Sequence, residues 1–291
     1  MAKPDFIIIG AAKSGTTSLA RYLDAHSEVQ IIGERLEFFG EYGNPRFGDM
    51  EAEQYKALMS NEDYEDKKVG EKSVSYLYAK SAPREIAELC PDAKLIVVLR
   101  DPSDRAYSDY WHRVRTGVEP LSFKDALDAE ARRIVDGARF ELHYTNYGRY
   151  ADHLSRYIKQ FGRDQLLVLF YEDLQSDPTK ATQQCFDFIG INAPAETQSF
   201  EVHNAGGNKT SGLVRAGLRL AQNKTIVTVL RRMLPKALTN MMGAYLVKKT
   251  SAGKYPDMNT EDRARLVSFF ADDITDLEEL TGRDLTDWRK V

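Results

Sequence analysis

The sequence has few cysteines and lacks the long apolar segments of membrane proteins. Its 291 residues include only Cys90 and Cys185, so neither a disulfide framework nor a cysteine metal spacing is present. We interpret both as buried, small apolar residues in a reducing compartment. There is no signal-peptide pattern at the start and no apolar run that could span a bilayer. We therefore expect a cytoplasmic protein without a transmembrane segment.

Linkers and repeats are also missing. No Pro/Gly/Ser-rich stretch divides the chain, and 291 residues with 42% hydrophobic content suffice for a full α/β core. We therefore expect one domain over residues 1–291. The net charge of −4 argues against wholesale binding to nucleic acid.

The chain is organised around its first strand and turn. The apolar run Phe6–Ile9 is followed by small polar residues and then by Leu19, Tyr22 and Leu23 at helical spacing, which predicts a buried strand turning into a helix. The turn between them includes Gly10, Lys13 and Gly15, and three hydroxyls follow the second glycine: Thr16, Thr17 and Ser18. Together with the free N–H groups of a helix N-terminus, they predict a phosphate-binding turn.

This turn departs from the nucleotide triphosphate P-loop, G-x-x-x-x-G-K-[ST], at the position that decides the chemistry. Gly10 and Gly15 have the P-loop spacing, but Thr16 occupies the lysine position and Lys13 lies inside the loop. A lysine inside the loop can still contact a group that is being transferred. The Lys-[Ser/Thr] pair that arranges magnesium in a P-loop is absent after Gly15. We expect no metal in the site.

Strand and helix patterns alternate along the chain. Buried strands are expected at 6–9, 29–32, 93–99 and 165–170, and helices at 50–61, 82–90, 148–161, 180–189 and 260–288. This alternation predicts an α/β fold, with a P-loop-like open parallel sheet flanked by helices on both faces.

A guanidinium follows the strand expected at 93–99. Ligands of open parallel sheets bind outside the carboxyl ends of the strands, so Arg100 should face the same crevice as Lys13. Ser108 lies two turns into the next helix, where its hydroxyl can reach the same anion. A kinase would more naturally place a metal-binding aspartate at a strand end, so the arginine favours a second phosphate without metal. The alternative is an ion pair with a local carboxylate, Asp101 or Asp104.

Three other segments carry charge. Lys72 lies in a segment that starts extended and leads towards a helix, which suits a second cation or a surface lysine. Residues 33–40 place charges beside Phe38 and Phe39, as in a loop at the mouth of a site or a solvated loop with an aromatic anchor. The stretch 209–254 is basic and has no acidic residue. It is either a surface for an anionic ligand, polymer or membrane, or a solvated helical face.

Three segments together resemble the sulfotransferases that use 3′-phosphoadenosine 5′-phosphosulfate (PAPS). Residues 10–18 resemble their 5′-phosphosulfate loop and residues 95–108 their 3′-phosphate motif. Glu71-Lys72-Ser73 is similar to the middle lysine motif of the carbohydrate branch, which includes the heparan sulfate N- and O-sulfotransferases and bacterial relatives. Residues 251–256 resemble that branch's late basic loop. The resemblance implies metal-free sulfuryl transfer to a hydroxyl or amine of a carbohydrate or another small or lipid-linked acceptor.

The resemblance also implies roles for individual residues. Six residues of the turn would hold the 5′-phosphosulfate: Lys13, Ser14, Gly15, Thr16, Thr17 and Ser18. Two would hold the 3′-phosphate: Arg100 and Ser108. Two would cap the nucleotide: Gly253 and Lys254. Lys72 would lie near the bridging oxygen or the sulfuryl group, so Lys13 and Lys72 are candidate catalytic residues.

The catalytic base is the position at which the sequence departs from that branch. The branch carries a Lys-Glu-x-x-Phe-Phe loop, whereas this chain has Arg35 at the glutamate position and Glu34 at the lysine position. Either Glu34 serves through a one-residue shift, or Glu37 takes the role from the same side of an extended segment. The histidine base of the cytosolic branch has no counterpart, because Val74 stands there. His112 is a weaker candidate.

Two other functions compete with sulfuryl transfer. A P-loop kinase acting on a small molecule would need magnesium and ATP, and the threonine at position 16 counts against it. A nucleotide-binding module without catalysis is supported only by the missing glutamate at position 35.

Overall fold

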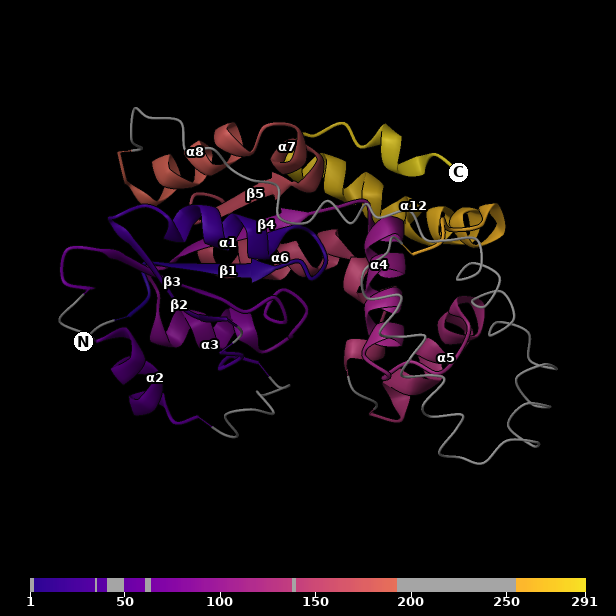
Figure 1. The fold of residues 1–291 in the computed structure, drawn as a ribbon, viewed down its shortest axis with the longest axis horizontal. Coiled ribbons are helices and arrows are strands. Elements are labelled where there is room, and N and C mark those ends of the chain that lie inside the picture. The colour runs from indigo at the N-terminus through magenta and orange to yellow at the C-terminus, as the bar shows by residue number, and fades with distance from the viewer. Residues whose placement is uncertain (1–2, 35, 41–49, 61–63, 138–139, 193–254) are drawn as a thin grey trace. The chain divides into compact units, whose positions relative to one another are not determined.

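The computed structural model describes residues 3–34, 36–40, 50–60, 64–137, 140–192 and 255–291 (Figure 1). The chain divides into two compact units. The first comprises Met1–Arg105, Tyr147–His203 and Phe269–Lys290, and the second comprises Ala106–Asn146, Asn204–Ser268 and Val291. One domain over residues 1–291 stays a prediction.

The first unit contains a parallel sheet of five strands. They are β1 (Phe6–Gly10), β2 (Val29–Glu34), β3 (Lys68–Lys72), β4 (Lys94–Leu99) and β5 (Leu166–Phe170). Their order is β2-β3-β1-β4-β5, and every neighbouring pair is parallel. The predicted open parallel sheet is therefore confirmed, with β1 at its centre.

Helices cover the sheet of this unit on both faces. They are α1 (Thr16–Asp24), α2 (Ala52–Met59), α3 (Ala82–Leu89), α6 (Tyr150–Phe161), α7 (Tyr171–Ser176) and α8 (Pro178–Ile189). Phe6 and Ile8 of β1 pack into one core cluster with residues of α1 and α8. Because side chains alternate along a strand, the equally buried Ile7 and Ile9 show that the opposite face is covered as well. Two longer helices, α4 (Pro102–Arg115) and α12 (Thr260–Thr281), each contribute residues to both units.

The second unit packs α5 (Phe123–Val135) with aromatic side chains of α4. Phe123 meets Tyr107 and Tyr110 with ring centroids 4.9 and 5.0 Å apart. Glu119 accepts hydrogen bonds from the Arg133 guanidinium at 2.6 and 2.9 Å and from the Tyr144 hydroxyl at 2.8 Å. Burial raises the pKa of Glu119, but these hydrogen bonds outweigh it and hold the pKa below its usual value. The carboxylate therefore stays charged and fixes this unit's interior.

Three short 3-10 turns complete the described chain: Phe140–Leu142, Asn146–Gly148 and Thr286–Arg289. The helix expected over 260–288 ends at Thr281, and Gly282 follows with a φ of +69°. Glycine tolerates this left-handed conformation and commonly ends a helix. None of the described helices is long and apolar enough to cross a membrane.

Candidate functional site

Three strand ends lie at one edge of the sheet. β3 and β4 flank β1 on opposite sides and run parallel to it, so the residues after Gly10, Lys72 and Leu99 share that edge. The chain leaves β1 towards β2 and β3 and returns on the other side as β4. Ligands of open parallel sheets bind at such a reversal of strand order.

The turn after β1 leaves polar groups for an anion. Gly15 precedes α1 with a φ of +83°, and among the described residues no side chain caps this helix. The first N–H groups of an uncapped helix attract negative charge. The Ser14 hydroxyl is buried, and it has no hydrogen-bond partner within the described chain. An orphaned hydroxyl beside an uncapped helix fits the oxygens of a phosphate or sulfate group.

The middle lysine meets this turn directly. Lys72, at the end of β3, donates a hydrogen bond from Nζ to Oγ1 of Thr17 at 3.0 Å. Only 4% of Lys72 is exposed, so this ammonium is not a solvated surface group. Lys72 and Thr17 were predicted as site residues from two different motifs, and they are in contact at this edge of the sheet.

Arg100 reaches the same turn from the end of β4. Its Nη1 donates to the Lys13 carbonyl at 3.4 Å, and its guanidinium lies 4.9 Å from the centroid of the Tyr171 ring. Its Nη2 is also 3.6 Å from Oδ2 of Asp104, so the ion-pair alternative is present too. Asp101 caps α4, because it accepts from the N–H groups of the next turn.

The candidate base loop lies beside the end of β3. The Glu37 N–H donates to Oγ of Ser73, and the Phe38 N–H donates to the Tyr76 hydroxyl, both at 2.9 Å. Glu37 is buried and has a φ of +50°. The backbone of Glu34 pairs in register with Lys72. The side chain of Glu34 and all of Arg35 lie outside the described residues.

Residues of α6 hold the segment that follows Lys72. The Arg156 guanidinium donates to the carbonyls of Leu77, Tyr78 and Ala79 at 3.3 to 3.4 Å. The Tyr157 hydroxyl donates to the Tyr76 carbonyl at 2.7 Å. These bonds satisfy carbonyls of an irregular segment, so residues of α6 fix the position of Tyr76.

Several predicted site residues are not placed together by the described chain. Ser108, buried, and His112, partly buried, belong to α4 within the second unit. Gly253, Lys254 and the basic stretch 209–254 lie outside the described residues. The roles assigned to all of them stay predictions.

Two residues near the site were missed from the sequence. Tyr171 follows β5, the neighbour of β4, so the strand-end rule that singled out Arg100 could have found it. Glu71 is fully buried, and burial raises its pKa to about 8. The signal for Glu71 was an acidic residue inside a buried strand, where an unpaired charge is costly.

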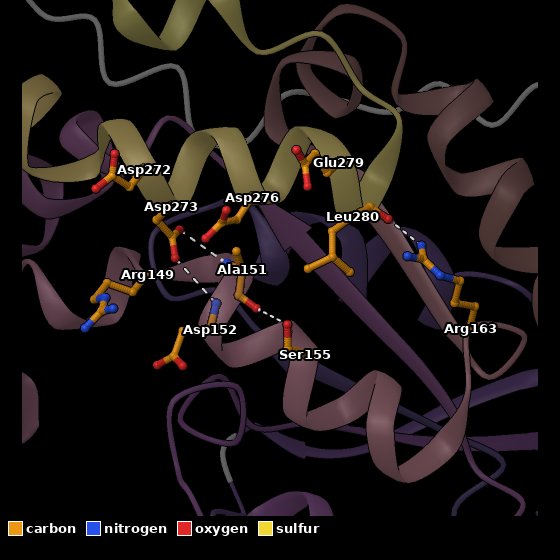
Figure 2. A pocket seen from close by; sticks show the side chains of 10 residues that line it. All are labelled: Arg149, Ala151, Asp152, Ser155, Arg163, Asp272, Asp273, Asp276, Glu279 and Leu280. Atoms are coloured by element: carbon orange, nitrogen blue, oxygen red, sulfur yellow. Dashed lines mark hydrogen bonds between the residues drawn. The ribbon is translucent and has the colours of Figure 1, made fainter.

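A hollow of about 590 Å³ lies elsewhere in the first unit, between α6 and α12 (Figure 2). Half of the ten residues that line it are acidic, among them Asp272, Asp273 and Asp276. Asp273 accepts hydrogen bonds from the N–H groups of Ala151 and Asp152. None of the site residues expected from the sequence lines this hollow. Among the described residues, no group of three or more His, Cys, Asp or Glu could hold a metal ion.

The sequence pattern of the family described as "Sulfotransferase domain" matches residues 3–277. The chain belongs to the sulfotransferase family. A crystal structure of a sulfotransferase from Alicyclobacillus acidocaldarius is 29% identical, with a TM-score of 0.73 and full coverage of both chains. This confirms the fold expected from the resemblance.

Curated relatives come from the carbohydrate branch. Human bifunctional heparan sulfate N-deacetylase/N-sulfotransferase 3 is 27% identical over 98% of this sulfotransferase chain and 31% of its own length. Human heparan sulfate glucosamine 3-O-sulfotransferase 3B1 is 28% identical over 97% of this chain and 64% of its own length. The chain thus spans about a third of the first relative and less than two thirds of the second. Membership in this family does not favour the kinase or the non-catalytic alternative.

Proposed function

We propose that this sulfotransferase moves a sulfuryl group from PAPS to a hydroxyl or amine of a carbohydrate acceptor. The observation that carries the proposal is the hydrogen bond between Lys72 and Thr17. It joins the middle lysine to a phosphate turn that already contains Lys13, and Arg100 contacts the backbone of the same turn. Relatives named as heparan sulfate sulfotransferases support a carbohydrate acceptor. The cytoplasmic location stays a prediction.

The proposed reaction is an in-line displacement at sulfur. The acceptor oxygen or nitrogen forms a bond to sulfur while the bond from sulfur to the bridging oxygen breaks. The acceptor proton passes to a carboxylate, and adenosine 3′,5′-bisphosphate leaves with the bonding electrons. Lys13, Lys72 and the N–H groups of α1 would stabilise the charge on the bridging and sulfuryl oxygens, as in phosphoryl transfer.

The fixed donors would act through preorganisation. The Lys72 ammonium is buried, and the turn is held by the bond from the Ala11 N–H to the Val98 carbonyl of β4 and by Arg100. Charges held in a water-poor site stabilise a transition state more strongly than solvated ones. No metal is needed for this charge balance, because cations from the chain would serve.

Calorimetry with two nucleotides tests the donor. We expect adenosine 3′,5′-bisphosphate to bind without magnesium and more tightly than ATP, because Arg100 suits a 3′-phosphate. The variant Arg100→Ala should weaken this binding by roughly tenfold or more, the scale of one charge-assisted contact. The matched control is Arg84→Ala, since Arg84 is an exposed arginine of α3 that pairs with Glu85 and Glu88 of the same helix. Magnesium-dependent ATP binding that is tighter than bisphosphate binding would contradict the proposal.

A further inference from the structure

Glu71 is a buried carboxyl group two residues before Ser73, whose hydroxyl binds the candidate base loop. It lies on β3 next to Lys72, but the side chains of neighbouring strand residues point to opposite faces. Lys72 therefore reaches the phosphate turn, while Glu71 acts on the hydroxyls of Tyr55 and Tyr76. Glu71 is fully buried, and among the described residues neither carboxyl oxygen has a hydrogen-bond partner.

Four aromatic residues form a layer that includes part of the loop: Phe38, Phe39, Tyr55 and Tyr76. Phe38 stacks on Tyr55 with ring centroids 4.4 Å apart, and Phe39 meets Tyr55 and Tyr76 edge-on at 5.2 and 5.4 Å. The Tyr76 hydroxyl also accepts the hydrogen bond from the Phe38 N–H. The loop that carries Glu37 thus packs against Tyr55 and Tyr76, the two tyrosines whose hydroxyls influence the pKa of Glu71.

The groups around Glu71 favour the neutral form of its carboxyl group over the ionised form. Tyr55 comes from α2, Tyr76 follows β3 and Cys90 follows α3, and all three are neutral hydroxyl or thiol groups whose pKa values are raised, chiefly by burial. No cation of the described chain is among the groups that change the pKa of Glu71. Burial raises that pKa to about 8, and the two tyrosine hydroxyls offset burial only in part. Ionisation would leave a buried charge without a counter-ion.

We propose that Glu71 is a positioning residue whose neutral form keeps the aromatic layer and the Glu37–Gly40 loop closed, and whose ionisation releases that loop. A loss of activity in alkaline solution is then expected, and it would originate at Glu71 and not at a group that touches substrate. The activity part of this inference rests on the proposed sulfuryl transfer, whereas the loop movement does not.

Hydrogen exchange tests the loop movement without any substrate. Amide exchange in the Glu37–Gly40 peptide is measured at pH 6.5 and pH 9.5 and corrected for the intrinsic effect of pH. We expect the wild-type loop to lose protection at least tenfold at the higher pH, and Glu71→Gln to keep it, because glutamine imitates the neutral acid. Glu88→Gln, at an exposed position of α3, should behave like the wild type.

Equal loss of protection in wild type and Glu71→Gln would overturn the inference, and so would a wild-type loop that stays protected at pH 9.5. If Glu71→Gln does not fold, infrared spectroscopy of the wild type replaces it. The band of a protonated carboxylic acid should then vanish over the same pH range in which the loop opens. Opening without that loss would also overturn it. A failure of sulfuryl transfer with intact loop switching would count only against the proposed function.

If transfer is observed, its pH profile gives a second readout. The alkaline decline of kcat in the wild type should weaken in Glu71→Gln, whereas a purely structural role would lower kcat equally at every pH. An unchanged alkaline decline in Glu71→Gln would contradict the role of Glu71 in activity.

Discussion

Charge at the site is held by a few side chains with different tasks. Lys72 is buried and bonded to Thr17, so it supplies a fixed positive charge beside the phosphate turn. Arg100 divides its guanidinium between the turn backbone, Asp104 and the Tyr171 ring. Such sharing orients the guanidinium before a ligand binds and reduces the entropy lost on binding.

The identity of the base is a residue-scale question with a direct test. We expect Glu37→Gln or Glu34→Gln, but not both, to lower kcat about 10²- to 10⁴-fold, the usual contribution of a positioned general base. Binding of adenosine 3′,5′-bisphosphate should be unchanged in the same variant, because the base acts on the acceptor. Steady-state kinetics and calorimetry of the two variants provide the comparison. If both variants retain full turnover, neither carboxylate is the base.

At the residue scale, the sequence indicated which residues meet at the glycine turn, and their roles stay predictions. Lys13 and Thr17 could be found because they lie in the turn, Arg100 because it follows a recognisable strand, and Lys72 because it lies in an extended segment. Glu71 could not be placed in this way, because its significance depends on Tyr55 of α2 and on how the irregular segment after β3 places Tyr76. The sequence pattern of one strand or helix does not predict which residues of other segments it will contact.

Elements determine where these side chains can reach. β3 could be only partly predicted: the sequence indicates an extended segment around Lys72 that leads towards a helix, and α3 does follow. Between them, residues 73–79 form turns held by backbone bonds to β1 and by Arg156, which the sequence did not predict. The short helix α7 was not predicted either, because six residues give too little periodicity to distinguish it from a loop.

The positions of most strands could be predicted from the sequence, but the pairing between them could not, as one glycine shows. Phe6 of β1 stands in register with Gly70 of β3, and a Cβ at Gly70 would lie 2.2 Å from the Phe6 ring. Apolar runs predicted where the strands lie. The need for a glycine opposite Phe6 became evident only from the pairing of the strands.

The contact between α12 and α6 gives an element-scale prediction. Asp273 accepts from the N–H groups of Ala151 and Asp152 at 3.2 and 3.4 Å, and burial raises its pKa to about 6 (Figure 2). Arg149 and the carboxylates of Asp272 and Asp276 line the same hollow. Because the folded-state pKa is raised, this group's stabilising contribution is complete below about pH 4 and is lost as the pH rises through 6.

Asp273→Asn should remove that dependence. Between pH 4 and 7, the free energy of unfolding of the wild type should fall by about 2 kcal/mol relative to the variant, allowing for partial exposure. Urea unfolding at the two pH values gives the comparison. Asp276→Asn, on the same helix, is the control. A variant that follows the wild type across the range would show that Asp273 does not titrate as its burial suggests.

For the whole molecule, the central claim is that the edge of one parallel sheet serves sulfuryl transfer and not phosphoryl transfer. The displaced lysine of the turn, Lys13, distinguishes it from a magnesium-dependent P-loop. Lys72 and Arg100 reach that same turn from the two neighbouring strands. Family membership and the bacterial structure of the same fold agree with this assignment.

The most direct test is mass spectrometry of glucosaminoglycan oligosaccharides, with free amines and hydroxyls, after incubation with PAPS in the absence of metal. We predict products that have gained a sulfuryl group, and we predict that Lys13→Ala lowers their rate of formation about 10²- to 10³-fold while leaving the melting temperature nearly unchanged. Lys159→Ala, at an exposed position of α6, should form product at the wild-type rate. Phosphorylated products formed from ATP and magnesium, or sulfated products formed equally fast by Lys13→Ala, would contradict the account.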